Sequence, residues 1–320
     1  MLLSKTPLRI SFVGGGSDYF NNKSNVKGRV ISVSINKYLY VTLNKRYNNQ
    51  IRAAYSETEI VNSTNDLKHN IIRESLKKYS IKNGVELTTI ADVPSSGSGL
   101  ASSSALSVGL AHSLRKFKKL KITKKTLAED ACDIEINKCK KPIGMQDQYS
   151  TAFGGLNKIE FSNNKVIVKK IPLNDQDLTI FKNHLMLFYT GINRQADKIL
   201  TNIKKSGNQF KNYEELSYLA KNFEKELLNK NFQNCGEILH ENWNLKRSLD
   251  KSVSSINLDN IYSIAKKSGA VGGKILGAGG GGYFLFLVKP KYKKKMKNNL
   301  KKLQEINFNF TKDGSRLIEV

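Results

Sequence analysis

Cysteine and histidine are scarce in this sequence of 320 residues, and long apolar runs are missing. The three cysteines, Cys132, Cys139 and Cys235, and the four histidines form no CxxC or HExxH pattern. We therefore expect reduced thiols, a cytoplasmic location and no structural metal site. No stretch approaches the roughly 18 apolar residues that a membrane span needs, and the best run, YFLFLV at 283–288, predicts a buried strand. The first residues carry too many charges and too short an apolar run for a signal peptide.

Acidic residues are also few, since 27 aspartates and glutamates stand against 53 lysines and arginines, a net charge of +26. Such a charge is typical of nucleic-acid-binding proteins. The lysines, however, are spread along the whole chain. Around the densest cluster, residues 289–302, Tyr292, Met296, Leu300 and Leu303 follow at helical spacing, which predicts an amphipathic helix with a solvated basic face. Nucleic-acid binding stays an alternative, and we expect the positive field to attract anionic small molecules.

Strand and helix patterns mix along the chain without the regular alternation of a doubly wound sheet. Runs rich in β-branched and aromatic residues predict strands at 8–13, 29–46, 50–56, 85–93, 184–191, 283–288 and 306–310, and a hairpin at 157–171 that turns at Asn163 and Asn164. Helical spacing predicts helices at 66–79, 102–117, 123–139, 258–268 and 289–302, with further helices filling 193–248. A chain of this length exceeds what one core usually supports. We therefore expect an α+β protein with domains at 1–175 and 176–320.

Residues 93–110, VPSSGSGLASSSALSVGL, combine a strand end, a loop of glycines and serines, and the start of a helix. Between Ser95 and Ser104 only Leu100 is larger than alanine or serine. Small residues let a phosphate approach the main chain, and a helix N-terminus adds N–H donors and a positive dipole end. The loop lacks the P-loop pattern, and Ser102 stands where GxGxxG requires glycine. A flexible linker is disfavoured, because a linker would not be held between an apolar strand and an apolar helix.

A second glycine run, GAGGGG at 277–282, matches GxGxxG through Gly277, Gly279 and Gly282. A dinucleotide fingerprint must open a helix, whereas here a strand pattern follows at once. The match to the dinucleotide-binding fingerprint is therefore accidental. Six small residues before a strand still predict the close approach of a ligand or of another backbone.

Three motifs, in this order, resemble those of the GHMP kinase family: TPLRISFVGGGSD at 6–18, PSSGSGLASSSA at 94–105 and KILGAGGGG at 274–282. The resemblance covers nearly the whole chain. It implies the two-domain GHMP kinase fold, with a ribosomal-protein-like N-terminal domain that carries the nucleotide loop and the catalytic aspartate, and a ferredoxin-like C-terminal domain that carries the third motif. It also implies an ATP-dependent kinase that uses Mg²⁺.

Within that family the chain is most similar to the bacterial D-glycero-D-manno-heptose 7-phosphate kinases, through GGGSD at 14–18, IGMQDQYSTAFGG at 143–155 and FYTGINR at 188–194. This implies phosphorylation of the anomeric hydroxyl of a sugar phosphate, for surface polysaccharide precursor synthesis. Gly15 replaces the glutamate of galactokinases, which we expect to open space and to remove a negative charge. A kinase of a neutral monosaccharide, fucose- or galactose-like, or of a non-sugar alcohol stays an alternative, as does a basic nucleic-acid-binding protein.

The resemblance also implies roles for individual residues. Asp147 matches the general base, and Arg9 matches the basic residue that pairs with it. Ser103 and Glu135 match the magnesium ligands. The expected nucleotide-binding residues are Pro94, Gly97, Ser98, Gly99, Leu100, Ala101, Ser102, Ser103 and Ser104. The expected substrate-binding residues are Gly14, Gly15, Gly16, Ser17, Asp18, Asp147, Arg194, Gly279 and Gly280, with Arg194 clamping the distal phosphate of the sugar.

Each of these charged residues also has an ordinary interpretation. Asp147 could be a plain acid at a helix start, Glu135 a solvated helix residue beside Asp130 and Asp133, and Arg9 a surface charge. Trp243, the only tryptophan, is expected in the core. The expected partners are a small-molecule sugar phosphate and ATP, without nucleic acid or membrane, in a monomer or a homo-oligomer. The sequence contains no RNP-like aromatic motif of the kind that binds RNA.

Overall fold

The first sheet is built from the β-branched and aromatic runs of the N-terminal half. The computed structural model describes residues 1–319 apart from 20–26, 95–96, 163–164, 194–195 and 206–208. Six strands follow one another in the order β12-β1-β2-β5-β3-β4, and β6 and β7 extend the sheet from β2. The strands are β1 (Leu2–Val13), β2 (Gly28–Lys45), β3 (Ile51–Ala54), β4 (Thr58–Val61), β5 (Val85–Ala91), β6 (Leu156–Ser162), β7 (Lys165–Lys170) and β12 (Arg316–Glu319).

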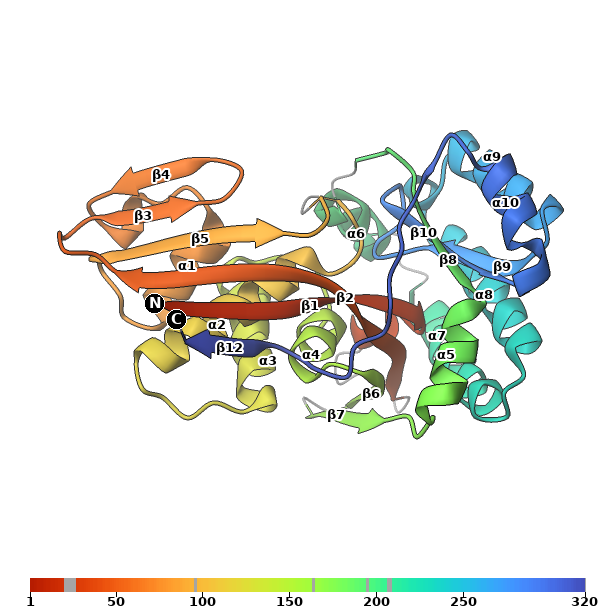
Figure 1. Cartoon of the computed structure of the whole chain (residues 1–320), viewed down its shortest axis with the longest axis horizontal. Helices are drawn as coiled ribbons and strands as arrows, with labels where there is room; N and C mark the ends of the chain where they lie inside the picture. The colour runs from red at the N-terminus through yellow and green to blue at the C-terminus, as the bar shows by residue number, and fades with distance from the viewer. Residues whose placement is uncertain (20–26, 95–96, 163–164, 194–195, 206–208, 320) are drawn as a thin grey trace.

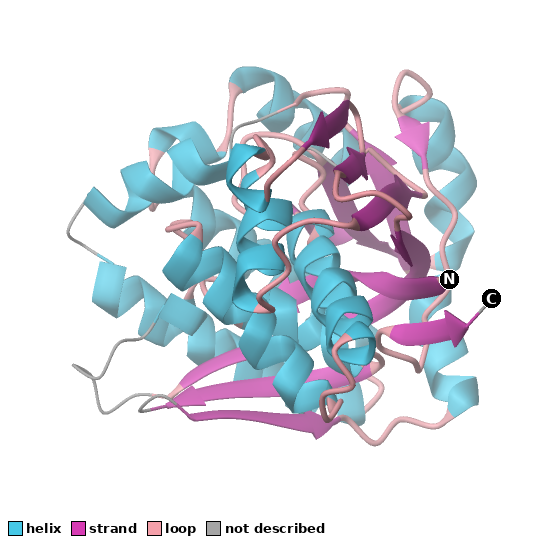
Figure 2. Cartoon of the chain, turned by 90° about the vertical axis from the view of Figure 1, so that its left-hand side faces the viewer, coloured by secondary structure: helices cyan, strands magenta, loops and turns pink. Residues whose placement is uncertain are grey.

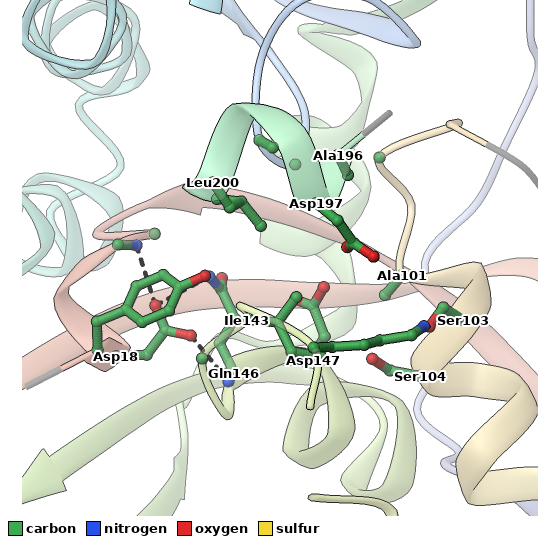
Figure 3. A pocket seen from close by; sticks show the side chains of 18 of the residues that line it. Asp18, Ala101, Ser103, Ser104, Ile143, Gln146, Asp147, Ala196, Asp197 and Leu200 are labelled. Carbon is green, nitrogen blue, oxygen red and sulfur yellow. Dashed lines mark hydrogen bonds between the residues drawn. The ribbon is translucent and has the colours of Figure 1, made fainter. Parts of the chain in front are cut away.

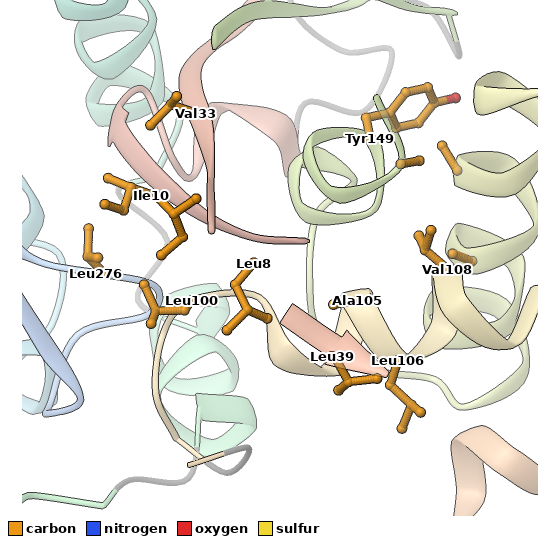
Figure 4. Packing of buried hydrophobic residues seen from close by; sticks show 14 of the residues in the cluster. Leu8, Ile10, Val33, Leu39, Leu100, Ala105, Leu106, Val108, Tyr149 and Leu276 are labelled. Carbon is orange, nitrogen blue, oxygen red and sulfur yellow. The ribbon is translucent and has the colours of Figure 1, made fainter. Parts of the chain in front are cut away.

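Helices pack against this sheet (Figure 2). They are α1 (Asn70–Lys78), α2 (Ser102–Phe117), α3 (Lys124–Cys132), the π-helical segment η3 (Asp133–Lys138) and α4 (Gln146–Phe153). Helix α2 lies so close to β1 that a Cβ at Gly109 would stand 3.0 Å from Ser4 Oγ. Around it, Leu8, Leu39 and Leu106 form part of the buried core (Figure 4).

The second sheet has the strand order β11-β8-β10-β9. Its strands are β8 (Leu185–Tyr189), β9 (Ala270–Ile275), β10 (Tyr283–Val288) and β11 (Gln304–Glu305). The helices of the C-terminal half are α5 (Asp175–Asn183), α6 (Ala196–Lys205), α7 (Gln209–Leu228), α8 (Phe232–Arg247), α9 (Ile256–Lys267) and α10 (Lys293–Asn299). Helices α8 and α9 pack on β9 of the second sheet, whereas α7 packs on β1 and β2 of the first sheet.

Strand β10 is apolar along its whole length because both of its faces are buried. Leu285 and Leu287 join the core of the first sheet, whereas Phe284 and Phe286 join a second core around Trp243. Trp243 is fully buried, which confirms its expected place in the core. Because successive side chains of a strand point to opposite faces, one apolar run contributes to two cores.

In the described strand order the chain crosses twice between the two sheets. The first crossing runs from β7 through α5 to β8, and the second runs from β11 back to β12. Figure 1 shows this second segment, in blue, descending to β12 so that the two termini lie close together. β12, within the residues 176–320 that we expect to form the second domain, is hydrogen-bonded to β1 of the first sheet, with Leu2 opposite Glu319.

The glycine–serine loop contacts β1 at the part of its edge that β12 does not cover. β12 pairs with β1 only over the partners Leu2 to Lys5. Further along, the N–H of Arg9 donates to Leu100 O at 3.1 Å. Pro7, which has no N–H, marks a register shift between β1 and β2. The loop therefore replaces a neighbouring strand at the point where β1 carries Arg9.

Several predicted elements have different bounds in the structure. The helix predicted at 123–139 divides into α3 and η3. The helix predicted at 289–302 is α-helical only at Lys293–Asn299, after a 3₁₀ turn at Pro290–Tyr292. The strand predicted at 306–310 is wrong apart from one bridge, Phe310 to Ile35. The predicted hairpin forms from β6 and β7, but its turn at Asn163 and Asn164 lies outside the described residues.

Candidate active site

The glycine–serine loop joins β5 to the N-terminus of α2, as the sequence predicts. Gly97 (φ +68°) and Gly99 (φ +76°) have left-handed backbones, which glycine adopts without steric cost. Ala101 has the same conformation (φ +66°), which costs a residue with a Cβ about 1–2 kcal/mol. Pro94 is exposed at the start of the loop, and buried Leu100 anchors it in the core (Figure 4).

The first turn of α2 presents main-chain donors beside this loop. The N-cap residue, Ala101, has no side-chain acceptor for them. The first intrahelical bond runs from Ala105 N to Ala101 O at 2.8 Å, so the N–H groups of residues 102–104 precede it. A contact of 3.0 Å between Ser98 Oγ and Ser102 Oγ orders the loop. These donors and the positive end of the helix dipole suit an anion such as a phosphate.

Glu135 lies under the same helix turn and is fully buried, so its interpretation as a solvated surface acid is wrong. Its carboxylate accepts hydrogen bonds from Ser103 Oγ, from Ser104 Oγ at 2.7 Å and from Gln148 Nε2 at 2.7 Å. The π-helical segment η3 carries it, and π turns frequently mark functional sites. Lys141 Nζ completes the cluster, 3.2 Å from Glu135 Oε1 and 2.5 Å from Ser103 Oγ.

Arg9 connects the loop with Asp147 at the start of α4. The guanidinium is only 2% exposed, so Arg9 is not a surface charge. Its Nε and Nη2 donate to Asp147 Oδ1 at 2.9 and 2.6 Å, and its Nη1 donates to Gly99 O at 2.7 Å. Asp147 stays 27% exposed. A carboxylate is therefore held by a buried cation at the edge of the glycine–serine loop, with an open side toward the cavity.

Asp18 lies on the opposite side of Asp147 from the glycine–serine loop, as Figure 3 shows. It accepts hydrogen bonds from Gly16 N at 3.0 Å, Gln146 N at 3.1 Å and Gln146 Nε2 at 3.2 Å. Burial, and to a smaller extent the charge of Asp147, raises the pKa of Asp18, while the main-chain donors act against this rise. Gly144 must be glycine here, since a Cβ would stand 2.1 Å from Asp18 Oδ2.

Arg9, Asp18, Asp147, Lys141 and residues 97–99 and 101–104 line one cavity of about 190 Å³, whereas the fully buried Glu135 is not among its lining residues. Several lining residues were not predicted from the sequence: Tyr19, Lys141, Gln146, Asp197, Tyr213 and Lys246. Asp197 and Leu200 enter from α6, above Asp147 in Figure 3. Such side chains come from elements distant in sequence, and apart from Gln146, which lies in the stretch 143–155, none belongs to a motif quoted above. Gln146 alone could have been found, because it directly precedes Asp147 in the helix start.

Some of the predicted site residues lie behind the cavity wall. Gly279 packs on Val253, and Gly280 packs on Ile199, whereas Gly277 and Ala278 of the same motif line the cavity. A Cβ at Gly14 would stand 1.9 Å from Arg29 O, and Ser17 Oγ bonds Gly14 O at 2.7 Å. Arg194 lies outside the described residues.

Gly15 does not open the space that we expect from the loss of a glutamate. A Cβ there would lie 3.3 Å from Gln146 Nε2 and 3.5 Å from Ser11 Oγ. The carboxamide of Gln146 fills this position and bonds both Ser11 and Asp18. A neutral amide therefore lies beside Gly15, and no carboxylate is among the atoms nearest to a Cβ there, in line with the expected loss of negative charge.

Comparisons with known proteins agree with this architecture. The family described as GHMP kinases N terminal domain matches residues 67–155, and that described as GHMP kinases C terminal matches residues 223–305. A D-glycero-alpha-D-manno-heptose 7-phosphate kinase of Campylobacter jejuni is 31% identical over 97% of this chain and 97% of its own. The chain therefore belongs to the GHMP kinase family. The expected α+β, two-domain GHMP kinase fold is confirmed.

Two further comparisons are with a solved structure, which shows a similar fold, and with a more distant relative in sequence. The crystal structure of a D-glycero-D-manno-heptose 1-phosphate kinase from Bacteroides thetaiotaomicron superposes with a TM-score of 0.81 at 22% identity, over 100% of this chain and 99% of that one. An L-fucokinase/L-fucose-1-P guanylyltransferase of Bacteroides fragilis is 26% identical over 74% of this chain and 25% of its own length. Among the described residues, no helix is long and apolar enough to cross a membrane.

Proposed function

We propose that this protein is an ATP-dependent kinase that phosphorylates the anomeric hydroxyl of D-glycero-D-manno-heptose 7-phosphate and so makes the 1,7-bisphosphate for surface polysaccharide precursors. The observation that carries the proposal is the Arg9–Asp147 pair. One face of this pair touches the glycine–serine loop through Gly99 O, and the other lies beside Asp18. A base therefore stands between an anion-binding helix start and a carboxylate suited to sugar hydroxyls.

Each residue then has a defined task in phosphoryl transfer, which depends mainly on positioning and charge stabilisation. Asp147 orients the attacking hydroxyl and accepts its proton. Arg9 holds that carboxylate and stabilises negative charge near Gly99. Asp18, Gly16 and Gln146 place the sugar. The N–H groups of residues 102–104 hold phosphate oxygens.

Ser103 and Glu135 suit Mg²⁺, which prefers few protein oxygens and completes its shell with water and phosphate. The structure supports this assignment, because the Lys141 ammonium contacts both Ser103 Oγ and Glu135 Oε1, which are themselves hydrogen-bonded, and so shows that a cation can stand beside these two oxygens. When bound, the metal would neutralise charge on the nucleotide phosphates. Lys141 would have to yield part of this position.

The anionic substrate is supported by three features. The chain has a net charge of +26, the glutamate position is taken by the neutral Gln146 amide, and Lys246 lines the cavity. The heptose 7-phosphate kinase of Campylobacter jejuni is similar over almost the whole chain. A neutral monosaccharide is the second candidate, because Asp18, Asp147 and Asp197 all line the cavity and carboxylates favour sugar hydroxyls over a phosphate. The fucokinase similarity, although partial, points the same way.

An ADP-release assay with four sugars separates these candidates: the heptose 7-phosphate, the unphosphorylated heptose, fucose and galactose. We expect a markedly higher kcat/KM for the heptose 7-phosphate than for the other three. Arg194→Ala and Lys246→Ala should each raise KM for the phosphorylated sugar more than KM for ATP. Equal rates on both heptoses would favour the neutral-sugar candidate, and no turnover of any sugar would refute both.

A further inference from the structure

A second cavity, of about 610 Å³, lies away from the candidate active site. It is bounded by β6, β7, α5 and the tail at 309–312. These segments include both described crossings between the two sheets, since α5 belongs to the first crossing and 309–312 to the second. In Figure 1 the blue tail passes beside α5 and β6 on its way to β12. Its volume falls within the range of small-molecule sites, roughly 300–1,000 Å³.

The residues that line this cavity are apolar on its floor and mostly positively charged elsewhere, a combination that suits one class of ligand. Its floor is apolar and includes Leu156, Ile171 and Phe310. Its charged lining residues are four lysines, Lys124, Lys170, Lys182 and Lys312, against one carboxylate, Asp175. This ratio exceeds that of the whole chain, which has 53 basic residues to 27 acidic ones.

Two of these lysines are held by the protein itself. Lys312 pairs with Asp175 at 2.6 Å, and Lys124 Nζ donates to Phe153 O at 2.8 Å. Lys170 and Lys182 make no ion pair with any residue in the described part of the chain. Lys182 instead lies near another cation, Lys293, whose pKa is lowered chiefly by burial and further by Lys182. Lys170 is near enough to Asp175 to help Lys312 lower the pKa of that carboxyl, but Asp175 is already paired with Lys312, so the four lysines of the rim face a single carboxylate.

A neutral polar group also lines the cavity. Asn157 is 5% exposed and donates from Nδ2 to Gly154 O at 2.7 Å, while its Oδ1 accepts no hydrogen bond from the described residues. Gly154 and Phe153 end helix α4, whose first turn carries Asp147. The cavity therefore touches both interdomain crossings and the far end of the catalytic helix.

We propose that this cavity is a second ligand site, which binds a compact anion that joins a phosphate or similar group to an apolar or planar body. The body would lie on Leu156, Ile171 and Phe310. The anionic group would be bound by Lys170 and Lys182, and a donor on the body would satisfy Asn157 Oδ1. Such a site is suited to an effector of the enzyme, because a ligand bound there would contact both of the segments that connect the two sheets.

The test uses 8-anilinonaphthalene-1-sulfonate, an aromatic anion whose fluorescence rises on binding, with the full-length protein saturated with Mg·ADP to block the nucleotide loop. The variant Lys170→Gln/Lys182→Gln removes the unpaired charges. Its matched control, Lys294→Gln/Lys295→Gln, removes the same charge from exposed positions on α10. Thr179→Trp, at an exposed lining position on α5, narrows the cavity without cutting into the core.

We expect binding that survives Mg·ADP, weakens about tenfold in the Lys170/Lys182 variant, as the loss of two charged contacts predicts, and stays unchanged in the control. Thr179→Trp should reduce binding as well, and melting curves show whether each variant is folded. Displacement of the probe by Mg·ADP, or equal binding in wild type and both cavity variants, would overturn the proposal. Competition by nucleoside monophosphates and by sugar phosphates, in separate titrations, then shows which of these sources supplies the anion.

Discussion

Two carboxylates at the candidate site differ because their surroundings differ. Asp147 is partly exposed and is paired with the buried guanidinium of Arg9. Asp18 is buried, and its raised pKa follows from that burial, although main-chain donors from Gly16 and Gln146 reduce the rise. The first arrangement gives an oriented carboxylate with an open side toward the cavity. The second favours an immobile acceptor for sugar hydroxyls.

Asp147→Asn keeps the size of the side chain and most of its hydrogen bonds but cannot take a proton. We expect kcat to fall about 10²–10⁴-fold, the range that general bases typically contribute, with ATP affinity nearly unchanged. Arg9→Ala should also lower kcat, and the double variant should lose less than the product of the two single losses, because the pair acts as one unit. Single-turnover rates would measure this. Near-wild-type turnover of Asp147→Asn, with chemistry rate-limiting, would make the assignment wrong.

Adjacent serines allow a matched test of the magnesium assignment. Ser103 and Ser104 both donate to Glu135, but only Ser103 also contacts Lys141. We expect Ser103→Ala to raise the Mg²⁺ concentration for half-maximal rate by about tenfold or more, since even outer-shell partners of a metal are worth about 10–100-fold. Ser104→Ala, which loses one hydrogen bond to the same carboxylate, should change it far less. Equal Mg²⁺ dependence in the two variants would remove Ser103 from the metal site.

At the scale of elements, the third glycine motif shapes the nucleotide loop from behind. Gly282 directly precedes β10, and Tyr283 N donates to Ser98 O at 3.3 Å. A Cβ at Gly282 would stand 2.6 Å from Ser98 O and 2.7 Å from Gly97 O. The close approach of another backbone that the sequence predicts therefore takes place between the second and third motifs.

Gly282→Ala tests this contact, and Gly191→Ala is its control. Both glycines have a positive φ, +87° and +72°, but nothing lies within 4 Å of a Cβ at Gly191. Backbone strain alone should cost each variant about 1–2 kcal/mol in the free energy of unfolding. Only Gly282→Ala should also raise KM for ATP, because its methyl group displaces residues 97–98. An unchanged KM for ATP in both variants would contradict a role for the third motif in shaping the loop.

At the scale of the whole molecule, the return of the chain to β1 ties its two ends together. Ser315, just before β12, contacts Thr6 Oγ1 at 2.9 Å and His112 Nδ1 at 2.9 Å. His112 on α2 is 8% exposed, and burial lowers its pKa from 6.5 to about 4. The neutral ring is therefore part of the contact between the helix layer and the C-terminal segment.

Acid should weaken this contact. Because the folded pKa of His112 is below its unfolded value, the unfolded chain binds the proton more tightly, and stability is lost as pH falls from about 6.5 toward 4. The full loss is about 3 kcal/mol. His112→Gln keeps a polar partner for Ser315 without titrating. Denaturant unfolding at pH 7, 5.5 and 4 should show a difference between wild type and variant that shrinks with acid. If the free energies of unfolding of wild type and His112→Gln changed in parallel with pH, the role assigned to the neutral His112 ring would be wrong.

Much of the fold could be predicted locally. The amphipathic spacing of α2, the apolar run of β10 and the glycine loops each follow from neighbouring residues, since side-chain periodicity and positive φ are local properties. The strand predicted at 306–310 was wrong because that segment is held by single contacts to Ile35 and Asn36 rather than by a ladder. β12 was missed because its four residues show little pattern without β1 as a partner.

The sequence by itself determined the glycine–serine loop between a strand and a helix, the family and the identity of Arg9 and Asp147 as a candidate pair. This was possible because a motif is a set of residue types at fixed spacing along the chain, which can be recognised without the tertiary structure. Only the tertiary structure decided that Gly279 and Gly280 lie behind the cavity wall, that Gln146 fills the space at Gly15, and that Lys141 contacts both Ser103 and Glu135. These facts depend on the distances between side chains from β1, η3, α4 and the loop before β10. Such distances are fixed by how the two sheets and their helices pack, and no local pattern records them.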